Sequence, residues 1–156
     1  MSPNFGYSVS GLDPDKTAKA SGRFIRCSPK SAREVCNTIK GMLLEKAKEY
    51  LMRVILKRQA VPFKRHKKHL AHRKGLQKWA SGRYPVKAAY YILSVIENAE
   101  ANAEYKGLDI ELCRIIHSAT HRGRIIKRYI QRAHGRSTAK YHHLSHVEIV
   151  IYEFPS

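Results

Sequence analysis

The chain has 156 residues, and its 30 Lys and Arg against 12 Asp and Glu give a formal net charge of +18. Its length predicts a single domain, 1–156, and a hydrophobic fraction of 43% is enough for a core, which excludes disorder throughout. Because so large an excess of one charge repels itself, we expect a polyanionic partner, most simply nucleic acid. The longest apolar run, 88–93, is far shorter than the roughly 20 residues of a membrane span. The first eleven residues also lack the basic and apolar regions of a secretory signal.

Three cysteines, Cys27, Cys36 and Cys113, are an odd number and widely spaced. They match neither a disulfide framework nor a zinc ribbon. We interpret them as small buried hydrophobic residues in a reducing compartment, the cytoplasm.

The basic residues gather in two tracts without a single acid. Residues 50–96 hold 12 Lys and Arg, and residues 112–147 hold 8 Lys and Arg with 6 His. Single-sign tracts of this length indicate two surfaces that both face phosphate. Two disordered basic tails are the alternative, which explains the second tract poorly because that tract alternates and ends in a strong strand pattern. The candidate RNA-binding residues are Lys64, Arg65, Lys67, Lys68, Arg73, Lys74, Lys78 and Arg83 in the first tract, and Arg122, Arg124, Lys127, Arg128, Arg132, Arg136 and Lys140 in the second.

In chain order, residues 1–19 are predicted to form a loop, and 20–26 a short strand with Phe24 and Ile25 as its apolar residues. Ser28 followed by Pro29 is typical of a helix start, and Gly41 of a helix end. Between them lie apolar residues at helical spacing: Ala32, Val35, Cys36 and Ile39.

A second helix is predicted over 44–59, ended by Pro62. Its apolar stripe consists of Ala47, Tyr50, Leu51, Val54 and Ile55. The basic segment 60–83 follows, and we name it the insertion. It has little core-forming pattern, so we expect it to become ordered on a partner. His66, His69 and His72 are three residues apart, but no cysteine or carboxylate lies near them, which favours contact with phosphate over zinc binding.

Pro85 opens a third helix that reaches about Lys106, with Gly107 as its cap. The predicted core stripe is Val86, Ala89, Tyr90, Leu93 and Ile96, broadened by Ile92, Val95 and Ala99. Three carboxylates recur at helical spacing on this helix, and paired carboxylates can serve general acid–base catalysis. Spacings of three and four more often make a solvated face, which is the interpretation we prefer for Glu97, Glu100 and Glu104.

Residues 109–131 and 137–152 alternate in the manner of strands, and together they predict one antiparallel hairpin that turns near 133–136. Val147, Ile149 and Ile151 share one face of its second strand. Residues 117–146 are expected to form an extended arm, with Gly135 at positive φ in the turn. A two-stranded ribbon alone is marginal in water, so the arm needs a surrounding partner. Tyr129 and Tyr141 could stack on bases or could fill the surface of the ribbon.

No Gly-rich phosphate loop or nucleophile elbow is present, and most histidines lack an acidic partner. We therefore predict no enzyme and no cofactor. Two other classes stay open: a DNA-compacting protein, compatible with the charge, and a small RNA-processing enzyme using His134, His142, His143 and His146.

Three motifs carry a resemblance to a known family. They are Asn-Ala-Glu-Ala-Asn-Ala-Glu at 98–104, Arg-Ala-His-Gly-Arg at 132–136, and Ser-His-Val-Glu-Ile-Val at 145–150. Because these three motifs occur together and in this order, the chain closely resembles large-subunit ribosomal protein twenty-two from about residue 20 to 152. The basic insertion is similar to the archaeal and eukaryotic branch. An archaeal source is expected because the chain stops at Ser156 without the long charged tail usual in eukaryotes.

The resemblance implies an α+β fold, with three helices packed on a small antiparallel β-sheet and a long β-hairpin extension. It implies a structural constituent of the large subunit that binds ribosomal RNA, supports its assembly and lines the nascent-polypeptide exit tunnel. Partners would be that RNA, neighbouring ribosomal proteins and the nascent chain, in the cytoplasm, without a membrane or a homo-oligomer. The motif positions imply a tunnel tip of Arg132, Ala133, His134, Gly135 and Arg136.

Overall fold

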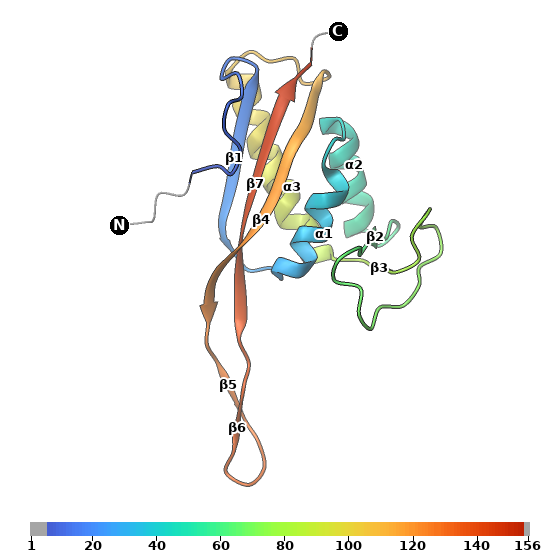
Figure 1. Ribbon diagram of the computed structural model, residues 1–156, viewed down its shortest axis with the longest axis vertical. Helices are drawn as coiled ribbons and strands as arrows, with labels where there is room; N and C mark the ends of the chain where they lie inside the picture. Colours follow the sequence, from blue (N-terminus) through green and yellow to red (C-terminus); the bar gives the residue numbers. More distant parts are fainter. Residues whose placement is uncertain (1–5, 155–156) are drawn as a thin grey trace.

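A three-stranded antiparallel sheet forms the centre of the fold (Figure 1). The computed structural model describes residues 6–154. The strands β1 (Thr17–Ile25), β4 (Cys113–Ile126) and β7 (His142–Glu153) lie in the order β1-β7-β4, so the last strand of the chain is the central one. Ala18 pairs with Ile151 on one side, and Ser118 pairs with Ile149 on the other.

Three helices cover one face of this sheet (Figure 1). They are α1 (Pro29–Ile39), α2 (Leu44–Ile55) and α3 (Val86–Tyr105). α3 packs against β1 and β7, α1 packs against β4, and α2 packs against α3. The α+β fold with three helices on an antiparallel sheet is thereby confirmed.

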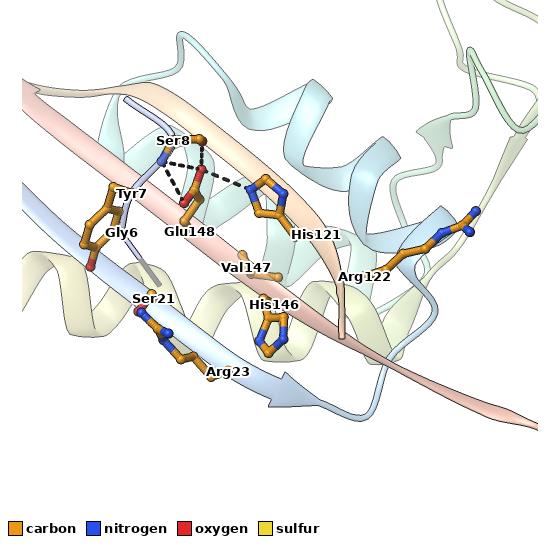
Figure 2. Close-up of a pocket in the computed structure, with 10 residues that line it drawn as sticks. All are labelled: Gly6, Tyr7, Ser8, Ser21, Arg23, His121, Arg122, His146, Val147 and Glu148. Atoms are coloured by element: carbon orange, nitrogen blue, oxygen red, sulfur yellow. Dashed lines mark hydrogen bonds and ion pairs between the residues drawn. The ribbon is translucent and has the colours of Figure 1, made fainter. Parts of the chain in front are cut away.

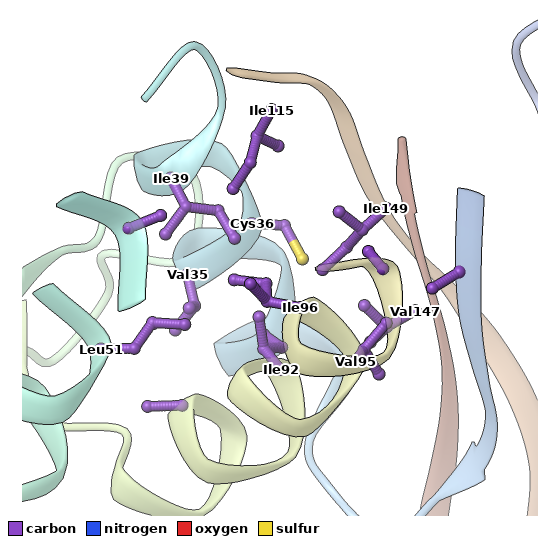
Figure 3. Close-up of a cluster of buried hydrophobic side chains, with 14 of the residues drawn as sticks. Val35, Cys36, Ile39, Leu51, Ile92, Val95, Ile96, Ile115, Val147 and Ile149 are labelled. Carbon is purple, nitrogen blue, oxygen red and sulfur yellow. The ribbon is translucent and has the colours of Figure 1, made fainter. Parts of the chain in front are cut away.

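The core lies between the helices and the inner face of the sheet (Figure 3). The apolar residues predicted for α1 are all buried, and Val147, Ile149 and Ile151 face them from β7. The three cysteines are buried and free, as predicted. On α3 the stripe is rotated from the prediction, because Tyr90 is 60% exposed while Ala88 and Ala103 are buried. Alanine suits these buried positions because its small side chain lets the helix lie close to its neighbours.

Helix ends follow local backbone chemistry in most cases. Ser28 is the N-cap of α1, and Gly41 and Gly107 at positive φ follow α1 and α3, as predicted. The prediction for α2 is wrong at its C-terminal end, because the helix stops at Ile55 and not at Gln59. Lys57 takes a left-handed backbone with φ of +58°, which ends the helix five residues before the proline.

The first strand is longer than predicted, since it begins at Thr17 and its pairing with β7 starts there. Phe24 does not join the core. Its φ is +54°, it is 44% exposed, and its ring packs edge-on against His146. The pairing with β7 shifts register between Gly22 and Ile25, and Phe24 lies within this irregularity, while Ile25 packs against the core.

Beyond the helices β4 and β7 leave the body as a narrow ribbon, shown at the bottom of Figure 1. The ribbon continues as β5 (Tyr129–Gln131) paired with β6 (Ser137–Ala139). One antiparallel hairpin was predicted and is confirmed, although its first strand begins at Cys113 and not at Asp109. A register shift between Ile115 and His117 lies within the packed part of β4, and a second one between Arg122 and Ile125 lies where the strand leaves the body.

The insertion is ordered on the body of the protein itself, in contrast to the expectation from its composition. It opens with β2 (Val61–Pro62) and closes with β3 (Gly82–Arg83), and these two strands pair. Val61 and Phe63 are buried in the core, and the Trp79 indole N–H donates to the carbonyl of Phe63 at 2.9 Å. These contacts help to fasten the segment to the body.

Among the helices of residues 6–154, none has the length and apolar character needed to cross a membrane.

Candidate nucleic-acid interface

The arm presents its basic residues to solvent along its whole outer half. Every residue from 124 to 141 is exposed, including six of the seven candidate cations of the second tract. The seventh, Arg122, is exposed at the root of the arm. Within residues 6–154 none of the seven forms an ion pair. The arm is thus a projecting ribbon of uncompensated positive charge, which suits contact with phosphates on both of its faces.

The tip of the arm is a tight turn made by the five motif residues. The Arg132 N–H donates to the Arg136 carbonyl at 2.8 Å, and the Arg136 N–H donates to the Ala133 carbonyl at 3.4 Å. His134 and Gly135 have φ of +59° and +64°. Positive φ at both central residues is the pattern of the two-residue hairpin turns whose twist matches the flanking strands. The predicted positive φ of Gly135 is confirmed, and the turn holds the two arginines on either side of the tip.

Tyr129 and Tyr141 face each other across the ribbon. Their rings are perpendicular with centroids 6.0 Å apart, and their hydroxyl oxygens are 3.3 Å apart. The hydrogen bond with Tyr141 raises the pKa of Tyr129. This pairing supports the second of the two sequence-based alternatives, in which the tyrosines cover the surface of the ribbon. Their remaining exposure of 62% and 42% leaves ring surface available to a partner.

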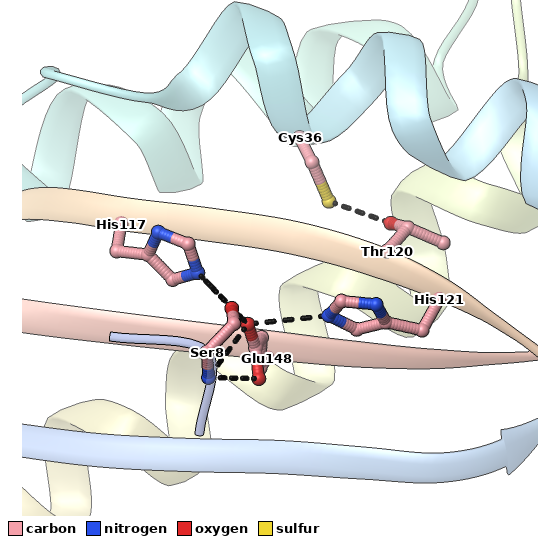
Figure 4. A network of polar contacts seen from close by, with 6 residues as sticks. All are labelled: Ser8, Cys36, His117, Thr120, His121 and Glu148. Carbon is pink, nitrogen blue, oxygen red and sulfur yellow. Dashed lines mark hydrogen bonds and ion pairs between the residues drawn. The ribbon is translucent and has the colours of Figure 1, made fainter. Parts of the chain in front are cut away.

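A network at the root of the arm ties the N-terminal segment to the outer face of the sheet (Figure 4). The Glu148 carboxylate accepts hydrogen bonds from the Ser8 N–H and hydroxyl, and it lies 2.8 Å from His117 Nε2 and 3.3 Å from His121 Nε2. Burial raises the pKa of Glu148, but the hydrogen bonds from His117, His121 and Ser8 outweigh burial and hold this pKa below its ordinary value. The sequence did not predict this role of Glu148. Alternation along β7 places it on the face opposite the core, where an exposed acid is expected.

The same network borders a cavity of about 320 Å³ lined by the N-terminal segment and by β1, β4 and β7 (Figure 2). Ser8, His117 and Glu148 are the residue types of the catalytic triad in nucleophilic hydrolases, but their geometry differs from that of a triad. Both Ser8 Oγ and Glu148 meet His117 at the same nitrogen, Nε2. A triad needs the base and the orienting acid at opposite ring nitrogens, so the network is a structural tie.

Basic residues of the insertion form a second exposed surface, on the side of the body that carries α1. All eight candidate cations of the first tract are exposed. Lys67 lies over the Trp79 ring at 5.4 Å, and Arg73 lies over the Tyr84 ring at 5.5 Å. Cation–π contact of this kind favours these positions of the two exposed side chains.

Glu34 is the residue that shapes the start of the insertion. It is fully buried, and its carboxylate accepts the backbone N–H groups of Lys64, Arg65 and His66 at 2.9–3.0 Å. The three donors neutralise much of the cost of burying this charge. In the sequence, the one local signal for the burial of Glu34 is its position between the core residues Ala32 and Val35.

The three histidines at 66, 69 and 72 are not gathered into a metal site. Within residues 6–154 no group of three His, Cys, Asp or Glu side chains is placed to hold a metal ion. Glu97 and Glu104 are exposed as predicted, whereas Glu100 is half-buried and pairs with Lys48 at 2.7 Å.

Comparison with known proteins gives a consistent result over nearly the whole chain. The family described as Ribosomal protein L22p/L17e matches residues 20–152. The chain is 52% identical over 143 residues to the large ribosomal subunit protein uL22 of Methanopyrus kandleri, covering 91% of this chain and 90% of the relative. It is 49% identical over 144 residues to that of Archaeoglobus fulgidus (92% and 93% covered) and 47% identical over 154 residues to that of Aeropyrum pernix (97% and 99% covered).

Proposed function

The chain belongs to the ribosomal protein L22p/L17e family, and on that basis we propose that it is a structural constituent of the large ribosomal subunit. In this role it binds large-subunit ribosomal RNA and supports its assembly. Its arm lines the tunnel through which the nascent polypeptide leaves. Its place in the cell is the cytoplasmic ribosome, its further partners are neighbouring large-subunit proteins, and its role is structural and not enzymatic.

The observation that carries the proposal is the outer half of the arm, residues 124–141, which is fully exposed and whose cations form no ion pair within residues 6–154. About ten residues at roughly 3.3 Å each extend the ribbon some 30 Å beyond the body. The ribbon contains no acid, and its isoleucines Ile125, Ile126 and Ile130 are 37–43% exposed, so it has little core of its own. Such a ribbon is stabilised when it is enclosed by a polyanion, and folded RNA supplies both the charge and a surrounding wall.

On this proposal, two separate parts of the chain contact the RNA. The arm contributes the seven cations of the second tract, and the insertion contributes the eight of the first tract. No base-reading motif is present, so recognition rests on phosphate positions and the shape of the RNA. The tip residues 132–136, with Arg132 and Arg136 on either side of Gly135, are then the part that faces the tunnel.

Co-sedimentation with ribosomal particles tests the proposal. A tagged copy of the chain expressed in an archaeal host is expected to migrate with the large subunit and to remain there after a high-salt wash. A steep salt dependence of binding alone does not discriminate, because every phosphate-binding protein shows it.

Two results would contradict the assignment. Equal affinity for duplex DNA and for folded large-subunit RNA, with absence from washed particles, would indicate a DNA-compacting protein. RNA turnover that is lost on changing one histidine of the candidate set, such as His134, would indicate an enzyme.

A further inference from the structure

A second cavity, which we name the α1–insertion pocket, lies between the first turn of α1 and the start of the insertion. Its volume is about 420 Å³. α1 packs against β2, which brings these two segments of the chain together, as the positions of α1 and β2 in Figure 1 show. The basic side chains that line it are Lys30, Arg65, His66, Lys67, Lys68 and Arg83.

The lining of this pocket has the composition of a phosphate site. It contains no Asp or Glu, and Ser28 and Ser31 add two hydroxyl groups from α1. Neither Lys30 nor Arg65 forms an ion pair within residues 6–154. A concave surface lined by one sign of charge focuses its field on the ligand, more strongly than the same charges on a flat surface.

The nearest carboxylate does not oppose an anion in the pocket. Glu34 is one turn along α1 from Lys30, but it is fully buried and its oxygens accept three backbone N–H groups from residues 64–66. Its charge is therefore directed at the backbone of the insertion. The same hydrogen bonds hold the chain that carries Arg65 and Lys67, so that the cations are in place before a ligand arrives.

We propose that the α1–insertion pocket binds phosphodiester groups of large-subunit ribosomal RNA, with Lys30 as a direct phosphate contact and Glu34 as the residue that positions the insertion. This inference rests on the proposed function and extends it. It makes α1, which lies outside both basic tracts, a part of the RNA-binding surface. It also joins α1 and the insertion in one binding site, so that a single RNA segment contacts both.

Two lysines at opposite ends of α1 provide a matched test. Lys30 lies in the first turn and lines the pocket, whereas Lys40 is the C-cap residue, and both are exposed. Each is changed to alanine in the full chain. Affinity for a transcript of archaeal large-subunit ribosomal RNA is then measured as a function of salt, and thermal unfolding verifies that both variants are folded.

Lys30→Ala is expected to lower the affinity about three- to tenfold at moderate salt and to reduce the slope of log affinity against log salt by about 0.7–0.9. Lys40→Ala is expected to leave affinity and slope within error of the wild-type values. Lys30→Ala with Lys67→Ala should lower the slope by about twice as much as Lys30→Ala alone.

The outcomes separate the two proposals. If the wild-type chain binds the RNA and Lys30→Ala behaves like Lys40→Ala, the pocket is not a phosphate site and the proposed function is unaffected. If the wild-type chain shows no preference for the ribosomal transcript over duplex DNA of equal length, the proposed function fails and the pocket proposal fails with it.

Discussion

Two buried or nearly buried carboxylates, Glu34 and Glu148, each fasten a segment that has little core of its own. Glu34 receives the backbone of the insertion, and Glu148 receives the N-terminal segment through Ser8. In a chain with a net charge of +18, each acid also reduces the repulsion between the cations around it. Of the few acids in this protein, these two therefore hold the insertion and the N-terminal segment on the body.

Glu34→Gln is expected to destabilise the protein by about 2–4 kcal/mol, because an amide keeps only one acceptor oxygen for three donors and loses the charge. Chemical denaturation measures the change in the free energy of unfolding of the whole protein. Hydrogen exchange should show faster exchange for the amides of residues 64–66, with the amides of β7 still protected.

Glu49→Gln is the control for this variant. Glu49 forms an exposed i,i+4 pair with Arg53, and such pairs contribute little. If the Glu34 and Glu49 variants were equally stable, Glu34 would not hold the insertion.

Glu148 gives the stability a pH dependence with a definite sign. Because the pKa of this carboxyl is lower in the folded protein than its ordinary value of 4.5, its contribution is complete above pH 4.5. The contribution is lost as the pH falls below 4.5 and through the folded pKa. Thermal unfolding between pH 3 and 6 should therefore show the Tm of the wild type falling toward that of Glu148→Gln at the acidic end. A constant difference in Tm over this range would contradict the assignment.

At the scale of elements, the hairpin divides into a packed half and a solvated half. Leu144 and Ser145 are the first buried residues after the exposed segment 124–141, and the Ser145 hydroxyl donates to the Cys27 carbonyl at 2.9 Å. Gly123 lies opposite them, where an added Cβ would meet the Leu144 carbonyl oxygen at 3.1 Å and His146 Nε2 at 3.0 Å. This close approach of the two strands marks the point at which the ribbon leaves the body.

Deleting residues 121–143 is expected to leave a folded domain, because the core is made by the helices and by the packed half of the hairpin. The deletion joins Thr120 to Leu144, three residues before Val147, the partner of Thr120 in the sheet. A cooperative thermal transition should remain, and affinity for ribosomal RNA should fall without being abolished, since the insertion is intact.

A shorter deletion of 124–141 removes only exposed residues and preserves the Ser145 hydrogen bond. Loss of the thermal transition in both deletions would show that the arm is needed for folding and would refute the division into two parts.

At the tip of the arm, the single residue Gly135 determines the conformation of the turn. Gly135→Val is expected to disturb the turn without affecting the Tm of the body, because the side chain has free space but the φ of +64° is unfavourable for valine. Chemical shifts of residues 131–137 should change while those of the helices remain. Gly75→Val, at φ of +91° in the insertion, is a matched control that should leave the tip unchanged. An unaltered tip in the Gly135 variant would contradict this account.

Over the whole molecule, charge and packing are separated in space. The helices and the inner sheet face contain the apolar residues, while the arm and the insertion together carry 15 of the 30 Lys and Arg on two projections from the same body (Figure 1). Both projections are connected to the core by only a few residues, such as Phe63 and Ser145. The core of the body therefore depends little on the two projections.

The sequence by itself determined those features that depend on near neighbours along the chain. Apolar spacing predicted the three helices, alternation predicted the hairpin, and Gly135 in the motif 132–136 predicted the turn. The acid-free tracts predicted exposed cations, because charged side chains without partners are not buried.

Only the tertiary structure decided features that depend on contacts between distant segments. The burial of Glu34 requires the backbone of residues 64–66, thirty positions further on, and the buried position of Glu148 requires Ser8 and His117. The exposure of Tyr90 follows from the rotation at which α3 meets β1 and α2. The order of the insertion follows from a place for Phe63 in the core, which no local pattern in a basic segment could reveal.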